Sequence, residues 1–408
     1  MSLHSQSSSP LSAAKAVAGG NVFLKLLTLA LSVFIGFLTI GMQLPVLPLY
    51  LHETLGMSTL VVGLVIGAQF VVALLSRAWA GNFADSRGAR RAVVAGLLIV
   101  ASSGLAYLAS LPFVTTPAIS VWILLTGRIV LAIGESLVVT GSLGWGIGLV
   151  GPQNAGKVMA WVGIAMYAAF ALGAPAGIVV NGNFGFAGIA VATILIPFVA
   201  LAMVALVPAV APLASKRIPF YKVFALVLIP GMGLALASIG FGMITGFIAL
   251  LFAAKNWGNS SLAFTAFGLA FIAARLLFGH LPDKLGGAKV AMVSVAIEAA
   301  GLLLIWSADT STIAYTGVAL GGFGYSLAFP GFGVEAARRA PPQSRSVAMG
   351  AYVAFLDISL GIASPLAGVI AGQWGVHTVF LAAGVAVGLS LLVAVRLLGK
   401  PSAGEKIS

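Results

Sequence analysis

Charged residues and cysteine are what this chain of 408 residues has least of. Only 7% of its residues are charged, against roughly a quarter in ordinary soluble domains, so a water-soluble fold is excluded. The absence of cysteine excludes disulfides, thiol nucleophiles and Cys-ligated zinc sites. The four histidines, His4, His52, His280 and His377, are scattered without metal-binding spacing. We therefore expect neither a metal nor a cofactor.

Hydrophobic residues make up 60% of the chain, enough for about twelve membrane spans of about 20 residues each. The sequence shows twelve apolar segments, at 23–51, 58–83, 92–111, 118–148, 158–180, 187–207, 221–254, 262–281, 290–306, 313–335, 347–372 and 376–398. They are apolar on every side, whereas the strands of outer-membrane barrels are about ten residues long and alternate in polarity. The sequence therefore predicts an all-α membrane protein with twelve transmembrane helices.

Basic residues predict the orientation of these helices. If the amino terminus is cytoplasmic, nearly all lysines and arginines of the loops fall on the cytoplasmic side, and Lys255 alone falls outside. Such an asymmetry indicates topology, so the net charge of +12 does not indicate nucleic-acid binding. Both termini are expected in the cytoplasm, with the chain spanning a bacterial inner membrane.

An internal repeat divides the chain into two halves. Four residues near the second span return with the same spacing near the eighth: Arg77, Gly81, Asp85 and Gly88, then Arg275, Gly279, Asp283 and Gly286. We expect a disordered cytoplasmic tail at 1–22, six-helix bundles at 23–207 and 221–398, a cytoplasmic connector at 208–220 and a cytoplasmic tail at 399–408. Two parallel repeats of this kind are a known transporter architecture.

The loop between the second and third spans carries a recognisable motif. Gly81, Asp85, Gly88, Arg90 and Arg91 resemble the signature of the major facilitator superfamily, although Ser86 stands where a basic residue is usual. A weaker copy contains Gly279, Asp283 and Gly286. The resemblance covers essentially the whole chain. It implies a transporter that works by alternating access, with these residues in its cytoplasmic gate.

The fourth span contains two charged residues, Arg128 and Glu135. A charge inside the membrane costs a few kcal/mol, so Arg128 must face a wet cavity or a partner, and Glu135 lies on nearly the same helix face. The stretch resembles the arginine motif of proton-linked facilitators, with Ala132 in place of a common glycine. The resemblance implies that Arg128 adjusts proton binding by a nearby carboxyl group, while a structural ion pair without turnover stays open.

Two other carboxyl groups lie at membrane depth. Because the eleventh helix of facilitator folds contacts the cavity, the resemblance ranks Asp357 second, after Glu135, as the proton-coupling carboxylate. Glu298 in the ninth span is expected to be a packing or lipid-edge residue, since that helix is usually peripheral.

The fifth span contains Gly173, Pro175 and Gly177, which resemble the glycine-proline motif of drug:proton antiporters, with Ala174 as a departure. This resemblance favours efflux over import. The two loop motifs and the chain length together resemble most the YhhS-type, or arabinose-efflux-like, bacterial permeases.

Polar and aromatic residues inside the spans are candidates for substrate contacts. Those proposed to line a central cavity are Gln43, Gln69, Tyr167, Phe241, Tyr325 and Tyr352. Aromatic side chains in apolar helices also serve as packed core or lipid-facing groups, and this alternative stays open. A cavity with aromatic walls and few charges would suit amphipathic organic molecules.

The sequence thus predicts a secondary transporter, a proton-coupled exporter of small amphipathic compounds. Its expected partners are the lipid bilayer, a small-molecule substrate and protons, and we expect a monomer. The alternatives are a proton symporter that imports sugars or organic acids, and a membrane receptor that does not transport. Catalysis is not expected, because no triad of His, Cys or Ser type is apparent, and no nucleotide-binding lysine motif indicates ATP-driven transport.

Overall fold

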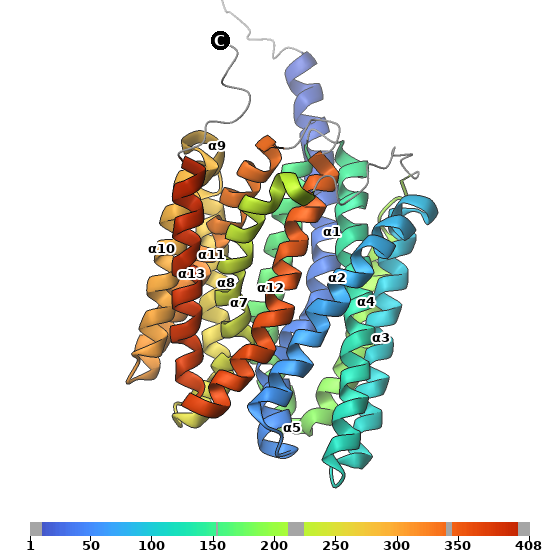
Figure 1. Cartoon of the computed structure of the whole chain (residues 1–408). Helices are drawn as coiled ribbons and strands as arrows, with labels where there is room; N and C mark the ends of the chain where they lie inside the picture. Colours follow the sequence, from blue (N-terminus) through green and yellow to red (C-terminus); the bar gives the residue numbers. More distant parts are fainter. Residues whose placement is uncertain (1–9, 152–153, 211–223, 340–344, 399–408) are drawn as a thin grey trace, which may run out of the picture.

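The computed structural model describes residues 10–151, 154–210, 224–339 and 345–398, which form a bundle of helices (Figure 1). The helices are α1 (Pro10–Leu49), α2 (Thr59–Arg87), α3 (Ala89–Ser110), α4 (Pro117–Val150), α5 (Ala155–Ala205), α7 (Leu228–Ala254), α8 (Ser261–Phe278), α9 (Leu281–Leu285), α10 (Gly287–Trp306), α11 (Ser311–Arg339), α12 (Arg345–Trp374) and α13 (Val376–Leu398). Short turns of other helical types occupy Tyr50–Thr54, Leu111–Phe113 and Ala225–Val227. Within the described ranges regular structure is entirely helical, as predicted.

Eleven helical stretches of the described residues are long and apolar enough to cross a membrane. The sequence predicts twelve, and the difference lies in α5, which covers both the fifth and the sixth predicted spans. Gly185 interrupts α5 with φ 62° and ψ −167°, a conformation outside the helical region. Two contacts show that the chain turns back at Gly185. Ala169, before it, contacts Gly41 of α1, and Thr193, after it, bonds to Gln43, two residues from Gly41. A straight helix would hold residues 169 and 193 about 36 Å apart.

The first helix begins earlier than expected. α1 starts at Pro10, within the residues 1–22 that we predict to form a disordered tail. Residues 1–9 of that tail, 211–223 of the expected connector and following span, and the tail 399–408 lie outside the described residues.

The exterior of the bundle is apolar, as contact with lipid requires. Large hydrophobic side chains are exposed on several helices, for example Leu75 at 73%, Trp122 at 69% and Leu195 at 58%. A helix that is hydrophobic all round belongs in a core or a membrane. These surfaces therefore support a multi-pass membrane protein.

Helix contacts define two groups and a seam between them. The first group packs α1 on α5 and α4 on both α2 and α3, and the second packs α10 on α11 and α13, α7 on α13, and α8 on α11. Between the groups, α2 lies along α12 (Figure 1) and α5 along α8. Glycines permit this approach: a side chain at Gly63 of α2 would collide with the Ser364 carbonyl of α12, and one at Gly268 of α8 would collide with Ala171 of α5.

Candidate functional site

A buried arginine organises polar side chains inside the first group of helices. Arg128 of α4 is 5% exposed and donates to the side-chain oxygens of Gln43 on α1, at 3.1 Å, and Gln69 on α2. Gln43 also accepts from the Tyr107 hydroxyl at 3.1 Å and donates to Thr193 at 3.1 Å. A guanidinium group taken out of water needs acceptors, and the two glutamines supply them. Gln43 and Gln69, which we predict to line the substrate cavity, are thus the acceptors of Arg128 in this conformation.

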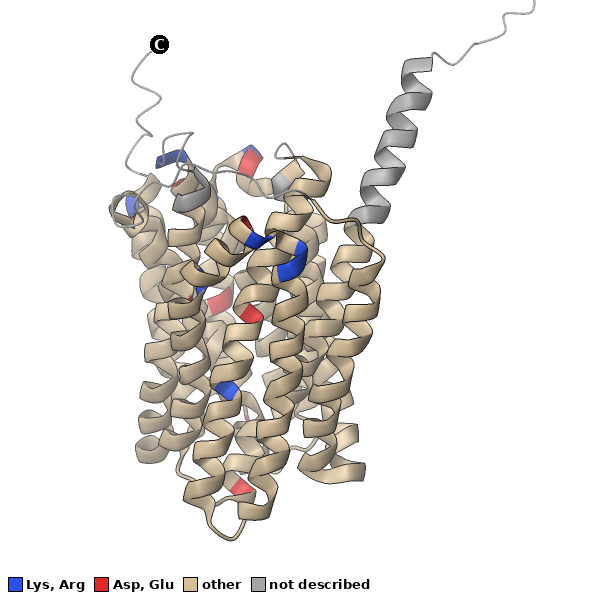
Figure 2. Cartoon of the chain, turned by 90° about the vertical axis from the view of Figure 1, so that its right-hand side faces the viewer, with Lys and Arg blue, Asp and Glu red and all other residues tan. Residues whose placement is uncertain are grey.

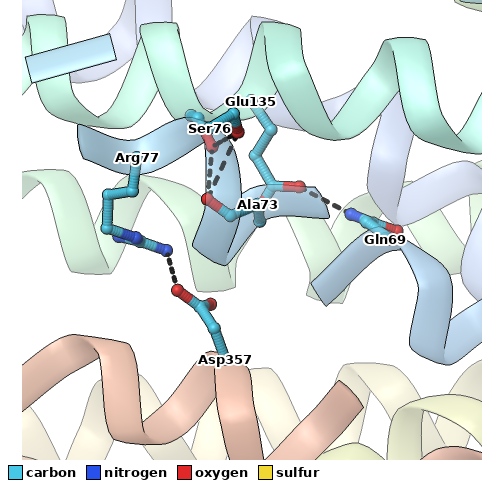
Figure 3. A network of polar contacts seen from close by, with 7 residues as sticks. Gln69, Ala73, Ser76, Arg77, Glu135 and Asp357 are labelled. Atoms are coloured by element: carbon cyan, nitrogen blue, oxygen red, sulfur yellow. Dashed lines mark hydrogen bonds and ion pairs between the residues drawn. The ribbon is translucent and has the colours of Figure 1, made fainter. Parts of the chain in front are cut away.

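Gln69 also connects Arg128 to Glu135. The Gln69 amide nitrogen donates to a Glu135 carboxylate oxygen at 2.6 Å (Figure 3). The Gln69 side-chain oxygen accepts from Arg128. Arg128 and Glu135 thus face the same interior, as their spacing predicts, but the contact between them runs through an amide. Next to Glu135 in the sequence, Ser136 of α4 accepts a hydrogen bond from Ser76 of α2 at 2.8 Å, and both hydroxyls also bond to the carbonyl of Ala73.

The second charged contact joins the two groups of helices. A terminal guanidinium nitrogen of Arg77 on α2 lies 2.7 Å from a carboxylate oxygen of Asp357 on α12 (Figure 3). The Asp357 side chain is only 3% exposed and that of Arg77 is 24% exposed. The sequence indicates Arg77 only as a member of the repeat, although a charged residue within a span is itself a signal of function.

Aromatic rings from both groups of helices meet in one cluster, which we call the aromatic cluster. It comprises Tyr167 and Phe170 of α5, Phe241 of α7, Phe267 and Phe271 of α8, and Tyr325 of α11. The centroids of Tyr167 and Phe271 are 3.7 Å apart in a stacked arrangement, and those of Phe241 and Tyr325 are 5.4 Å apart and nearly parallel. Three of the predicted cavity residues, Tyr167, Phe241 and Tyr325, are therefore brought together.

Two further residues complete the surroundings of the aromatic cluster. Arg275 of α8 places its guanidinium carbon 5.3 Å from the Phe271 ring centroid and interacts electrostatically with Tyr167, Tyr325 and Tyr352. Tyr352 itself donates its hydroxyl to the Phe329 carbonyl at 2.6 Å and packs its ring on Phe329. It therefore lies outside the ring contacts of the aromatic cluster.

The two copies of the loop motif have the same backbone geometry. Gly88, between α2 and α3, has φ 96° and ψ 139°, and Gly286, between α9 and α10, has φ 95° and ψ 139°. Glycine is the residue that adopts such angles readily. Figure 2 shows charged residues gathered at this end of the bundle.

The side chains of the motif make few contacts in this conformation. Arg90 donates to the Ala205 carbonyl at 3.3 Å, and Arg91 lines a nearby hollow of about 690 Å³. Asp85 and Asp283 are exposed and form no ion pair with any described residue. Gly81 lies near the Thr140 side chain of α4, and Gly279 follows directly on α8.

The glycines of the antiporter-like motif lie at the contact between α1 and α5. A side chain at Gly173 or Gly177 would collide with the backbone of Gly41 or Met42 on α1. Pro175 stands inside α5, between these two contacts. Close packing of α5 on α1 is thus what the motif provides here.

Glu298 does not lie at the lipid edge. This carboxyl group of α10 is 1% exposed and lies in the interior of the second group of helices, against α7 and α11. The packing part of our expectation agrees with this position, and the lipid-edge part is wrong.

Comparison with known proteins agrees with the architecture. The sequence profile of the Major Facilitator Superfamily matches the chain twice, at residues 29–232 and 230–408. An uncharacterized MFS-type transporter of Burkholderia mallei (strain SAVP1) is 45% identical over 353 residues, covering 86% of this chain and 87% of the relative. One of Salmonella typhimurium (strain LT2) is 41% identical over 358 residues, covering 88% of this chain and 92% of the relative.

Solved structures of the same fold have little sequence in common with the chain. A D-xylose-proton symporter matches with TM-score 0.77 and 14% identity, over 94% of this chain and 98% of that one. The nucleoside transporter NupG matches with TM-score 0.71 and 15% identity, over 92% and 99%. Two consecutive profile matches, relatives above 40% identity and this shared fold lead to one conclusion: the chain belongs to the major facilitator superfamily of membrane transporters.

Proposed function

We propose that this transporter is a proton-coupled secondary transporter that exports small amphipathic organic compounds by alternating access, as a monomer. The observation that carries the proposal is the ion pair between Arg77 and Asp357, which links α2 to α12 inside the membrane. A proton on Asp357 would remove its charge and therefore the attraction that holds these two helices together. Proton binding would thus favour a rearrangement of one group of helices against the other.

We further infer twelve spans in two halves. The reversal of α5 at Gly185 divides this helix into two segments, each long enough to cross the membrane. Counting them separately gives twelve spans instead of the eleven continuous helices. The family profile matches once on each side of residue 230, which supports bundles at 23–207 and 221–398. Basic residues at the ends of α2 and α11 support cytoplasmic termini in a bacterial inner membrane, by the positive-inside rule.

Glu135 is the second carboxylate proposed to take part in coupling. The Gln69 amide nitrogen donates a hydrogen bond of 2.6 Å to Glu135, and the Gln69 oxygen accepts one from Arg128. A change in the charge of Glu135 would therefore alter the hydrogen bonds of both Gln69 and Arg128. Asp357 and Glu135 also interact electrostatically. The two carboxylates therefore supply neighbouring proton sites beside the seam between α2 and α12.

The aromatic cluster is the proposed substrate site. Its rings come from both groups of helices and touch one another, so a substrate must separate them to bind. Stacking rings and few fixed charges suit flat or amphipathic organic molecules. The close packing of α5 on α1 at Gly173 and Gly177 resembles that expected of antiporters, which supports export and relation to the YhhS-type permeases.

Transport in proteoliposomes tests this proposal. Compounds that raise the thermal stability of the purified protein would be loaded into vesicles, and their counterflow and pH-gradient-driven movement measured. We expect saturable counterflow, and accumulation only when a pH gradient is imposed. Saturable binding without counterflow would identify a receptor, and counterflow without accumulation under an imposed pH gradient would exclude proton coupling.

A further inference from the structure

Glu298 is a buried carboxyl group that the network around Arg128 and Asp357 does not use. It is 1% exposed, and both of its carboxylate oxygens are buried without a hydrogen-bond partner. Every other carboxyl group that is wholly or partly buried among the described residues has a partner: Glu135 with Gln69, Glu335 with Arg339, and Asp357 with Arg77. Glu298 is therefore distinguished by its chemistry as well as by its depth.

Two glycines bring the neighbouring helices close to this group. A side chain at Gly240 of α7 would collide with a Glu298 carboxylate oxygen, and one at Gly324 of α11 would approach the Glu298 amide nitrogen to 2.6 Å. Gly240 thus leaves room for the carboxyl group, and Gly324 lets α11 approach the backbone of α10 at Glu298. The arrangement encloses a polar group without supplying any polar contact to it.

The charged and titratable residues of the surrounding helices leave Glu298 unpaired. α7 has no titratable residue, while Tyr325 of α11 and Tyr167 of α5 interact with Glu298 electrostatically. The charged or titratable residues of the other helices that pack on α10 are Asp283, Lys284, His377 and Arg396. None of these forms an ion pair with Glu298 among the described contacts.

An ionised carboxylate in this position would be costly. A charged side chain near the middle of a membrane costs about 2.5 to 3.5 kcal/mol even on lenient scales, and a buried charge without a partner ordinarily becomes neutral. A metal cation would need several oxygen ligands, and no polar group among the described residues bonds to the Glu298 carboxylate to serve as a further ligand. A proton needs only the carboxylate.

We propose that Glu298 is a proton-binding site of the C-terminal half, occupied in the conformation described here and separate from the site at Asp357. Tyr325 follows Gly324 directly and belongs to the aromatic cluster, so the proton site borders the proposed substrate site. A ligand that separates the rings would therefore also change the surroundings of Glu298. The part that this proton plays in transport rests on the function proposed above, whereas its presence on Glu298 does not.

Carbon-13 spectroscopy of the carboxyl groups tests the proposal directly. The full chain would be prepared with carboxyl-labelled glutamate, so that aspartates stay silent, and studied in lipid bilayers at neutral pH. We expect a carboxylic-acid signal in the wild type that disappears in Glu298→Gln. The matched control is Glu335→Gln, which should instead lose a carboxylate signal, because Glu335 pairs with Arg338 and Arg339.

Loss of a carboxylate signal in Glu298→Gln would overturn the proposal. If that variant does not fold, Glu298→Asp replaces it, since the introduced aspartate carries no label. The same preparations, tested for pH-driven transport, separate the two hypotheses. An acid signal without such transport supports the proton site and refutes proton coupling, whereas transport without the signal does the reverse.

Discussion

Asp357 and Arg77 neutralise each other's charge inside the membrane, so removing either one should destabilise the protein by leaving the other charge unpaired. Removing one partner of a buried pair costs about 3 to 5 kcal/mol, and we expect less here because Arg77 is 24% exposed. Asp357→Asn should lower the melting temperature in detergent, and Arg77→Gln combined with Asp357→Asn should recover part of the loss. A double variant that melts no higher than Asp357→Asn would show that the pair does not stabilise the seam.

Glu135 and Arg128 should respond differently to substitution because they occupy different ends of the same network. A glutamine at position 135 can still bond to Gln69 but cannot carry a charge, so Glu135→Gln should retain counterflow and lose accumulation driven by pH. Arg128→Ala leaves the Gln69 side-chain oxygen without its donor and removes one of the two donors to the Gln43 oxygen. Both activities should therefore fall, by about tenfold for each ~1.4 kcal/mol of stabilisation lost. Uphill transport at the wild-type rate in both Glu135→Gln and Asp357→Asn would refute the assignment.

The sequence predicts these charged residues as functional candidates but not their partners. Periodicity places Arg128 and Glu135 on one helix face, and the structure confirms this. The bridging position of Gln69 depends on how α2 packs against α4, and the Arg77–Asp357 pair depends on how the two groups of helices meet. Both are contacts between distant parts of the chain, which local spacing does not determine.

The packing of α5 on α1 depends on glycine at several positions. Gly177→Ala would place a methyl group on the Met42 backbone, and we expect a lower melting temperature in detergent. Gly163→Ala in the same helix is the matched control, because among the described residues the added group would contact nothing within 4 Å beyond the adjoining backbone of its own helix. Alanine is favoured over glycine inside helices by about 0.5 to 1 kcal/mol, so the control should be neutral or more stable. Equal effects of the two substitutions would contradict the packing role.

The helical elements themselves are largely predictable from the apolar segments. The predicted break between 180 and 187 contains Gly185, where α5 reverses. By contrast, the residues 10–22 contain serine, alanine and glycine, and composition suggested a tail where the structure continues α1. A predicted eighth span at 262–281 ends earlier, at Phe278, because the short helix α9 begins at Leu281.

For the whole molecule, the proposed orientation is open to a direct test. Reporter fusions at Ser408 and near Lys216 should report a cytoplasmic location, and one at Lys255, between α7 and α8, should report the opposite side. The reason is the distribution of basic residues across the predicted loops. A periplasmic signal at Ser408 or Lys216 would refute the topology.

The internal repeat makes Tyr167 the counterpart of Asp357, since each stands at the same spacing before a proline, Pro175 or Pro365. Asp357 pairs with Arg77, and Tyr167 lies within electrostatic reach of Arg275, the repeat partner of Arg77. One edge of the seam is thus held by opposite charges and the other by stacked rings beside a cation.

A proton on Asp357 would loosen the charged edge, whereas a flat ligand would enter the aromatic edge. Our hypothesis is that opening of the seam responds both to proton activity, through the pair of Arg77 and Asp357, and to ligand concentration, through the stacked rings. Tyr167→Asp should abolish this asymmetry by giving Arg275 a carboxylate partner. The chain has no cysteine, so single cysteines can be introduced beside each edge of the seam and their reactivity measured against pH. In the parent protein we expect reactivity to change with pH at the charged edge, and in Tyr167→Asp at both edges.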